Sequence, residues 1–485
     1  MTTHIAPGPG AGRTIAVIAS ATLAFAAAQT AVVPSLGAMA RTLGASAVDV
    51  TWTLSGHLIA AAIFTPLMGR LGDMFGKRRL LTLALLCFTV GAVVSAAGPD
   101  LPSVVAGRII QGVGGGIFPL GFAILRDELP PRRVAGSIGL LAALSGLGAG
   151  LGLVIGGVLT DHASYRWIFW LGAGAGTLST VAVRFLLPRS RVAGGGRVDV
   201  LGAAVLGLGL AAPLVAISQG NRWGWGDART VGLLAVGALT LASWVRIERR
   251  TADPLVHIPT LARLTVLLTN VATVFIALGM FGAFVLLPQL AQASPTTAYG
   301  LGVTATGAGL LLLPGSLVML LTGPLAGALS RRYGAKGALI LGALVTAVGL
   351  FALARDFDSR AALLGYSLIV FAGIGLAQVA MPNLVIEAVP PDRTGQAIGV
   401  NTLVRSVGSS LDAQVAATIT AASAVSGGLP AASGYARAFL VAGLASLAAV
   451  LVGVLIPGGP GNRHRAAEAP VVDAPAGLPS RDGPR

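Results

Sequence analysis

Long runs of apolar residues, separated by short polar or charged stretches, recur along the whole chain. Each run has about 18 to 25 residues, which is long enough for an α-helix to cross the hydrocarbon core of a membrane. The pattern predicts fourteen spanning helices with both chain termini on the same side. They are expected at residues 14–36, 49–69, 80–98, 102–125, 135–159, 166–187, 198–219, 229–248, 264–289, 302–328, 337–354, 361–386, 395–421 and 435–456.

The basic residues provide an independent check on this number of spans. If the N-terminus lies in the cytoplasm, 24 of the 33 lysines and arginines border the cytoplasmic face and 7 border the opposite face. Arg108 and Arg405 lie inside spans. Because cytoplasmic loops of membrane proteins are rich in lysine and arginine, the uneven distribution favours fourteen spans with cytoplasmic N- and C-termini.

The composition agrees with a multi-pass membrane protein. Hydrophobic residues make up 54% of the 485 residues and charged residues 11%, and the mean hydropathy is +0.83. The net charge of +15 does not indicate a nucleic-acid partner, because the cations are spread between apolar runs instead of forming one patch. Cys87 is the only cysteine, so no disulfide can form within the chain.

A polar stretch from Gly69 to Arg79, GRLGDMFGKRR, lies between the second and third predicted spans. It resembles the signature of the major facilitator superfamily at this place, Gly-x-Leu-x-Asp-x-x-Gly-x-Arg. The resemblance implies that this loop locks two helical bundles together in the outward-facing state, with Asp73 as the salt-bridging residue. Gly69, Gly76 and Arg78 complete the expected lock. The alternative is an ordinary positively charged loop with a turn.

A second copy of this pattern, at residues 327–336, falls between the tenth and eleventh spans, with Arg331 where the first copy has Asp73. The second hinge is therefore expected to keep the fold without the lock. An internal repeat of this kind is common in transporters. The resemblance and the repeat predict an all-α polytopic membrane protein with the major facilitator fold: two six-helix bundles at 1–188 and 264–457, two additional helices within 189–263, and a disordered cytoplasmic tail at 458–485.

The fourth span carries Arg108, Gln111 and Gly112 on one helical face. An arginine inside a membrane helix is costly and marks a cavity or a partner. The three residues match the family signature Arg-x-x-Gln-Gly, and the resemblance implies a role of Arg108 in proton coupling. A structural arginine bonded to carbonyl groups of a neighbouring span is the alternative.

The fifth span carries Gly148, Gly152, Gly156 and Gly157, a stripe that allows close approach of another helix. It resembles the antiporter signature Gly-x-x-x-Gly-Pro-x-x-Gly-Gly, which is characteristic of exporters. Leu153 replaces the proline, so the packing surface is expected to remain without the kink.

The first span lacks an acidic residue that is common in members of the family with fourteen spans. Phe25 occupies the corresponding position, and Gln29 and Thr30 are the polar groups near the middle of the span. Since a buried carboxylate would attract a cationic drug, its absence argues against a pump that is purely selective for cations.

The thirteenth span places Asn401, Arg405, Gly408 and Asp412 along one stripe of a helix. Asp412 is the carboxylate well inside a predicted span, and we expect it to bind and release protons in the transport cycle together with Arg405. A static ion pair, or a position at the outer water interface, is the alternative. His57 in the second span is a further candidate for proton coupling, and a histidine bonded to a neighbouring helix is the alternative.

Polar and aromatic residues within the spans are candidates for the lining of a transport cavity, because buried amides need partners or water. No metal-ligand cluster, phosphate-binding loop or nucleophile constellation is visible in the sequence, so we expect no metal, no cofactor and no enzymatic activity. The candidates for the cavity are Gln29, Thr30, Trp52, Gln111, Asn270, Gln378, Asn383 and Asn401.

The sequence therefore resembles the fourteen-span drug:proton antiporter branch of the major facilitator superfamily. The resemblance implies a monomer in the cell membrane that exports lipophilic or amphipathic small molecules, such as drugs, antibiotics or secondary metabolites, in exchange for protons. An importer or facilitator of a small metabolite is the alternative. A membrane enzyme or a receptor is disfavoured, because neither clustered catalytic residues nor a soluble output domain is present.

Overall fold

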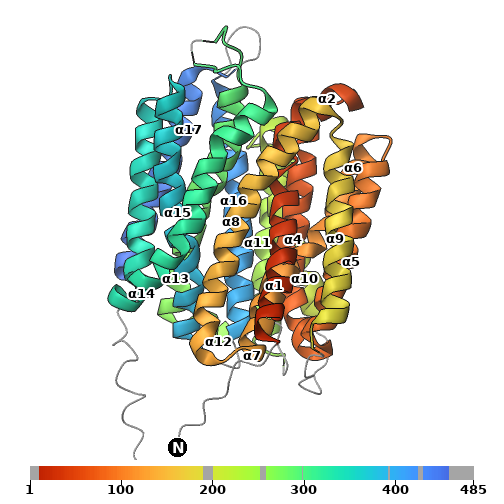
Figure 1. Ribbon diagram of the computed structural model, residues 1–485, viewed down its shortest axis with the longest axis vertical. Coiled ribbons are helices and arrows are strands. Elements are labelled where there is room, and N and C mark those ends of the chain that lie inside the picture. Colours follow the sequence, from red (N-terminus) through yellow and green to blue (C-terminus); the bar gives the residue numbers. More distant parts are fainter. Residues whose placement is uncertain are drawn as a thin grey trace, which may run out of the picture.

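The computed structural model describes residues 10–188, 200–251, 258–297, 299–390, 394–423 and 430–457. The regular elements of these residues are helices, and the long ones stand roughly parallel to the long axis of the molecule (Figure 1). The predicted tail at 458–485 lies outside the described residues.

Two groups of helices and a pair between them follow one another along the chain. The first group contains α1 (Ala11–Thr30), η1 (Val33–Ser35), α2 (Leu36–Leu43), α3 (Ala47–Val50), α4 (Trp52–Phe75), α5 (Lys77–Ala97), α6 (Leu101–Gly112), η2 (Val113–Gly116), α7 (Ile117–Glu128), α8 (Pro131–His162) and α9 (Arg166–Leu186). The pair is α10 (Val200–Trp223) and α11 (Ala228–Glu248), followed by the short α12 (Ile258–Leu261). The second group contains α13 (Leu264–Gln292), α14 (Ala305–Arg355), α15 (Arg360–Ala388), α16 (Thr394–Ala422) and α17 (Ala432–Leu455).

Eleven helices of the described residues are long and apolar enough to cross a membrane. Helices α4, α10 and α16 lie at the three remaining predicted spans, and the apolar stretches found in α4 and α10 end beside positions that are not described. In α16, Asn401, Arg405 and Asp412 interrupt the apolar run. The number of fourteen spans therefore stays a prediction.

Glycines account for two departures from straight helices. Gly334 has a φ of 79°, which divides α14 into two spanning segments at the second predicted hinge. The run Val113–Gly116 forms a 3₁₀ turn between α6 and α7. A Cβ atom on Gly112 would lie 2.8 Å from the backbone oxygen of His57 in α4, so this glycine allows the two helices to touch.

The two groups meet along two seams. Helix α8 packs against α14, and α4 packs against α16. Helix α10 contacts both α4 and α16, and Leu206, Leu210 and Trp244 of the α10–α11 pair form an apolar cluster with Val400 of α16. The pair thus covers the α4–α16 seam.

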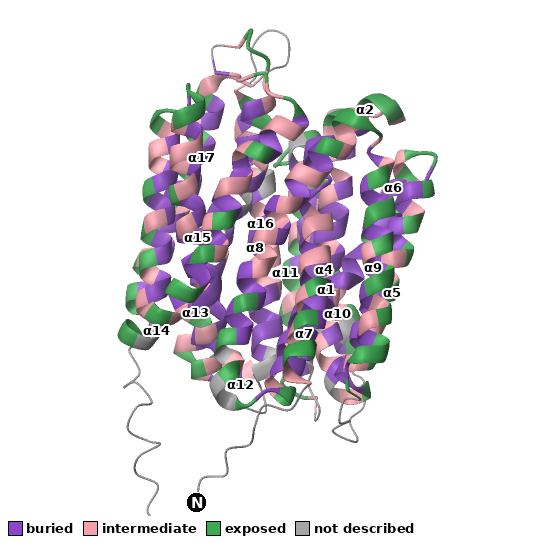
Figure 2. Ribbon diagram, in the orientation of Figure 1, coloured by how far each residue is buried: buried purple, intermediate pink, exposed green. Residues whose placement is uncertain are grey.

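The outer surface of the helices is apolar. Phe185, Leu178 and Leu321 are 77%, 72% and 71% exposed, and the exposed faces of the outer helices appear green in Figure 2. Water would penalise so many exposed apolar side chains, whereas lipid chains solvate them. The protein is therefore a multi-pass membrane protein. Below, the end with the α4–α5 turn is the lower end, and the end with α2 is the upper end (Figure 1).

Candidate functional site

A cavity lies where the two helix groups meet. Its volume is about 100 Å³, well below the roughly 300–1,000 Å³ of a typical ligand pocket. The helices must therefore separate before the cavity can hold a drug-sized molecule. Its wall is formed by Phe25, Ala26, Gln29 and Thr30 of α1; Leu58, Ala61 and Thr65 of α4; Gly115 and Phe118; Ser145, Gly146 and Ala149 of α8; Met280 and Phe284 of α13; Met319 of α14; Gln378 of α15; and Thr402, Arg405, Ser406 and Ser409 of α16.

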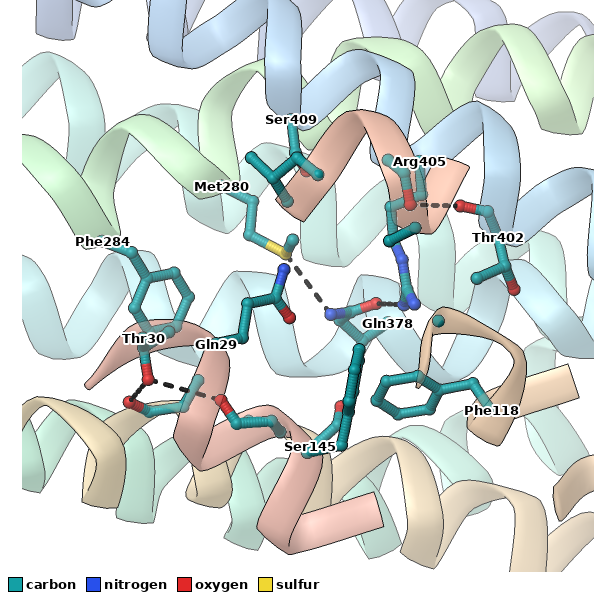
Figure 3. A pocket seen from close by; sticks show the side chains of 18 of the residues that line it. Gln29, Thr30, Phe118, Ser145, Met280, Phe284, Gln378, Thr402, Arg405 and Ser409 are labelled. Atoms are coloured by element: carbon teal, nitrogen blue, oxygen red, sulfur yellow. Dashed lines mark hydrogen bonds between the residues drawn. The ribbon is translucent and has the colours of Figure 1, made fainter. Parts of the chain in front are cut away.

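Arg405 borders this cavity from the α16 side (Figure 3). Its Nη1 donates a hydrogen bond to Oε1 of Gln378 over 2.6 Å, and the guanidinium carbon lies 5.9 Å from the centre of the Phe118 ring. The Nε2 of Gln378 contacts the sulfur of Met280 at 3.3 Å, a weak acceptor. An amide and an aromatic ring, instead of a carboxylate, therefore hold the arginine.

Among the described residues that line the cavity, Arg405 is the one with a charged side chain. The other polar groups are amides and hydroxyls, such as those of Gln29, Ser145 and Ser409. Because an arginine guanidinium stays charged in proteins, the cavity carries one positive charge in an otherwise apolar and weakly polar lining.

Three of the predicted cavity residues, Gln29, Thr30 and Gln378, do line this cavity. The hydroxyl of Thr30 also donates to the backbone oxygen of Ala149 over 2.6 Å, which ties α1 to α8. The aromatic and sulfur-containing members of the wall were not predicted, because apolar residues inside apolar spans carry no signal of which face they occupy.

Asn401 lines a second, smaller space that adjoins Arg405. Its Nδ2 donates to Oδ1 of Asn270 over 2.9 Å and to the hydroxyl of Thr273 over 2.8 Å. Asn270 therefore connects α13 to α16 and lines neither space.

Trp52, Gln111 and Asn383 also lie outside both spaces. For Gln111 the reason is clear, since its side-chain oxygen accepts a hydrogen bond from Arg108 over 2.9 Å. Cavity-lining roles for these residues and Asn270 stay predictions.

Arg108 is only 1% exposed and is surrounded by oxygen atoms of its own helix group. Its Nε donates to the backbone oxygen of Thr53 over 2.9 Å, and its Nη1 donates to Gln111 and, at 3.4 Å, to the backbone oxygen of Ala28. Arg108 therefore joins α6 to α4 and α1, behind the wall of the central cavity. Its Nη2 has no hydrogen-bond partner among the described residues.

His57 lies next to Arg108 and is 1% exposed. Its Nδ1 is 3.3 Å from the backbone oxygen of Arg108, whereas its Nε2 has no partner among the described residues. The ring centre is 5.6 Å from that of Phe25, which lines the cavity. One aromatic layer thus separates His57 from the cavity.

Asp412 is 4% exposed and does not line the cavity. Its carboxylate accepts a hydrogen bond from the backbone nitrogen of Gly282 in α13. No ion pair of Asp412 is present within the described part of the chain, and Arg405 lies seven residues earlier, about 10 Å along the helix.

The glycines of α8 face two different helices. Gly148, Gly152 and Gly156 lie against the backbone of α1 in the same group, whereas Gly157 lies against Ala305 at the start of α14 in the other group. Gly146 and Gly150 also face α14, where a Cβ atom would meet Met319 and Ser316. The sequence did not single out these two glycines, because they do not belong to the four-residue stripe.

The two hinges have matching geometry. Gly76 and Gly334 have φ values of 97° and 79°, a left-handed region that favours glycine. Two residues later, Arg78 donates to the backbone oxygens of Arg184 and Leu187 over 2.7 and 2.8 Å, at the end of α9.

In the second hinge, Lys336 donates to the backbone oxygens of Val454 and Ile456 over 2.8 and 2.5 Å, at the end of α17. Each cation thus caps the last helix of its own group. These two bonds of Arg78 lie within the first helix group. Gly69 has open space around it, and the side chain of Asp73 lies outside the described residues.

Comparison with known proteins matches the family model of the Major Facilitator Superfamily to residues 18–411, most of the chain. The chain belongs to this superfamily of transporters. The "Multidrug resistance protein B homolog" of Mycobacterium tuberculosis is 29% identical over 379 residues, covering 76% of this chain and 68% of that protein.

The chain is also similar to an export protein and, in its fold, to a sugar transporter of known structure. The "Tetracenomycin C resistance and export protein" of Streptomyces glaucescens is 27% identical over 413 residues, covering 84% of this chain and 76% of that protein. The xylose transporter XylE of E. coli, in a partially occluded inward-open conformation, has a TM-score of 0.63 at 15% identity over 92% of this chain and 97% of that chain. At this identity, the structural likeness supports the fold alone.

In this major facilitator protein the two helix groups are in contact at both ends. At the lower end, Phe122 and Ile138 share an apolar cluster with Val385 and Ile398 of the second group. At the upper end, the backbone nitrogen and the hydroxyl of Thr306 in α14 donate to Asp161 of α8 over 2.8 and 2.6 Å. The sequence did not mark this upper contact, because its two residues are 145 positions apart.

Proposed function

We propose that this transporter exports lipophilic or amphipathic small molecules in exchange for protons, by alternating access. The observation that carries the proposal is the central cavity, lined mainly by apolar and aromatic groups, at the junction of two helix groups that touch at both ends. The names of the two relatives above, a multidrug resistance protein and an antibiotic export protein, point in the same direction.

The cycle requires the contacts of one end to break while those of the other end hold. Opening the upper end separates α8 from α14 and breaks the bonds between Asp161 and Thr306. Opening the lower end separates the apolar cluster that contains Phe122 and Val385. In either open state the groups move apart, and the cavity gains the volume that a substrate needs.

The proposed arrangement in the cell membrane follows the charge pattern. The lower end faces the cytoplasm with both chain termini, and the chain crosses the membrane fourteen times as a monomer. Residues 1–188 and 264–457 form the two moving bundles, and residues 189–263 provide the pair that covers the α4–α16 seam. Asp73, with Gly69 and Gly76, locks the lower end in the outward-facing state, and Arg78 supports this hinge from within its bundle.

Asp412 is our first candidate for the proton carrier. A charge buried away from water is costly unless it is paired, and the described contacts of Asp412 include a backbone nitrogen but no cation. Binding a proton from one side and releasing it to the other would couple the proton gradient to the movement of α16 against α13. Arg108, His57 and Arg405 form the proposed surroundings of the proton path.

A metabolite importer or facilitator would use the same fold and the same cavity. Gly148, Gly152, Gly156 and Gly157 of α8 favour export only through their resemblance to the exporter signature, so the direction of transport has to be measured.

The test compares cells with and without the gene for the accumulation of Nile red, a neutral lipophilic dye, and for survival on a panel of lipophilic antibiotics. We expect expressing cells to accumulate less dye and a protonophore to remove the difference. Asp412→Asn should abolish export, whereas Asp356→Asn, a change of the same kind at an exposed loop position, should not. Export that persists in the Asp412→Asn variant contradicts proton coupling through this residue. Export that is unchanged by the protonophore contradicts proton coupling altogether.

A further inference from the structure

The central cavity holds a positive charge that the protein itself does not neutralise. Arg405 is the charged residue among the described residues of its wall, and these include no aspartate or glutamate. Asp412 lies on the same helix, about 10 Å from Arg405 along its axis. Its carboxylate accepts a hydrogen bond from the backbone of α13. The charge on Arg405 is therefore available to a ligand.

The two arginines inside spans differ in this respect. Arg108 is enclosed by backbone and amide oxygens of its own helix group and does not border the cavity. Arg405 has one hydrogen bond within the described residues, to Gln378. A guanidinium carries five N–H donors. None of the nitrogens of Arg405 is both buried and without a partner, and Arg405 lines both the central cavity and the smaller space beside it, so donors remain accessible from these spaces.

The surroundings of Arg405 fit a flat or chain-like apolar body attached to an acidic group. Phe118 packs beside the guanidinium, and Phe25 and Phe284 lie across the same cavity. Gln378, whose amide nitrogen contacts only the weakly accepting sulfur of Met280, offers a second donor at the same place.

We propose that the cavity selects amphipathic organic monoanions, whose acidic group pairs with Arg405 and whose apolar body lies among the phenylalanines. The proposal rests on the proposed export function and adds the charge class of the substrate. A lipophilic cation would meet a like charge without a compensating carboxylate, and a neutral molecule would gain one hydrogen bond but no ion pair.

The charge of the substrate also determines how the membrane potential acts on transport. If one proton enters for each molecule expelled, export of a monoanion moves two charges across the membrane, a neutral molecule one, and a monocation none. A negative potential inside should therefore accelerate export of a monoanion more strongly than export of the other two classes.

The test uses three probes with the same fluorophore and different charge: dansylglycine as the anion, dansylglycinamide as the neutral analogue and dansylcadaverine as the cation. Binding to the purified full chain in nanodiscs is followed by dansyl fluorescence, with empty nanodiscs as blanks. We expect dansylglycine to bind about tenfold or more tightly than dansylglycinamide, because an ion pair with hydrogen bonds replaces a neutral contact.

Variants of the protein test whether Arg405 causes the preference for the anionic probe. Arg405→Gln should remove the preference for dansylglycine, Arg405→Lys should keep part of it, and Arg355→Gln, which removes an exposed arginine at the end of α14, should leave it unchanged. In proteoliposomes, an imposed negative potential on the side from which the probe leaves should speed transport of dansylglycine most.

Equal or tighter binding of dansylglycinamide or dansylcadaverine by the unaltered protein overturns the proposal, and this comparison does not depend on any variant folding. A preference for the anion that survives in Arg405→Gln overturns the assignment to Arg405. Transport of the neutral or cationic probe without the anion refutes the anion class while export itself stands. If none of the three probes is transported and cells with and without the gene retain Nile red equally, both the anion selectivity and the proposed export function are refuted.

Discussion

Replacing Gly157 with alanine should weaken the closure of the upper end specifically. Gly157 lies on the face of α8 that touches α14, at the seam between the two helix groups. A Cβ atom at this position would lie 2.6 Å from the carbonyl carbon of Ala305 and 2.7 Å from the nitrogen of Thr306. These are backbone atoms, so no rotation of a side chain can relieve the overlap.

The size of the effect follows from these distances. Carbon atoms in contact prefer separations of about 3.5–4.0 Å, so α8 and α14 must move apart by about 1 Å. This movement would stretch the bond between the nitrogen of Thr306 and Asp161 from 2.8 Å to about 3.8 Å, beyond hydrogen-bonding range. Overpacking of this kind costs about 1–3 kcal/mol, which lowers the population of the closed upper end by about 5- to 150-fold relative to the open one.

Gly156 provides a matched control. A Cβ atom there would lie 2.7 Å from the carbonyl carbon of Ala31, the residue that ends α1 in the same helix group. The same substitution at the neighbouring residue therefore crowds an equally rigid backbone without touching the seam. Gly156→Ala should lower the thermal stability and leave the balance between open and closed upper ends unchanged.

The assay measures the distance between spin labels at Ala163 and Thr296, one in each helix group at the upper end, by pulsed electron paramagnetic resonance. Cys87 is the only native cysteine, so a Cys87→Ser background makes the labelling specific. We expect Gly157→Ala to enlarge the long-distance population and Gly156→Ala to leave it as in the parent. If Gly157→Ala leaves the distances unchanged, or if Gly156→Ala produces the larger shift, the α8–α14 contact does not control the upper end.

Three further substitutions test individual contacts. Arg78→Gln should lower the stability by about 1–2 kcal/mol, because two charged hydrogen bonds to the end of α9 are lost, and the exposed neighbour Arg79→Gln should have no such effect in a thermal unfolding assay. Lys336→Met should speed hydrogen exchange at the end of α17, where two carbonyl groups lose their donor; unchanged exchange would contradict the capping role. Asp161→Ala should enlarge the same long-distance population as Gly157→Ala with little crowding of its own, and an unshifted distribution would show that these hydrogen bonds are dispensable.

Local properties of the sequence were sufficient to predict the general architecture. Apolar length, charge asymmetry between loops and the repeated hinge all depend on residues close together in the chain. The structure has a helix at every predicted span, and both hinges contain a glycine with positive φ. The family could be recognised from the same short motifs. Fourteen crossings stay a prediction, because eleven helices of the described residues are long and apolar enough to span a membrane.

The sequence alone could not predict which charged residue borders the candidate site. Arg108 and Arg405 are both arginines in apolar helices and look equivalent in the sequence. In the structure Arg108 is held by oxygens of its own group, whereas Arg405 borders the cavity. The difference arises because the neighbours of a membrane helix come from distant parts of the chain.

The sequence by itself determined that this protein is a membrane transporter with hinged helices. A helix that crosses a lipid layer needs a certain length and apolar composition, and both depend only on consecutive residues. Only the tertiary structure decided which glycines of α8 touch the partner group and which cation faces the cavity. In a lipid environment nearly every helix face is apolar, so hydrophobicity cannot distinguish an inward face from an outward one. That choice depends on close packing between helices, which becomes visible only when the helices are assembled.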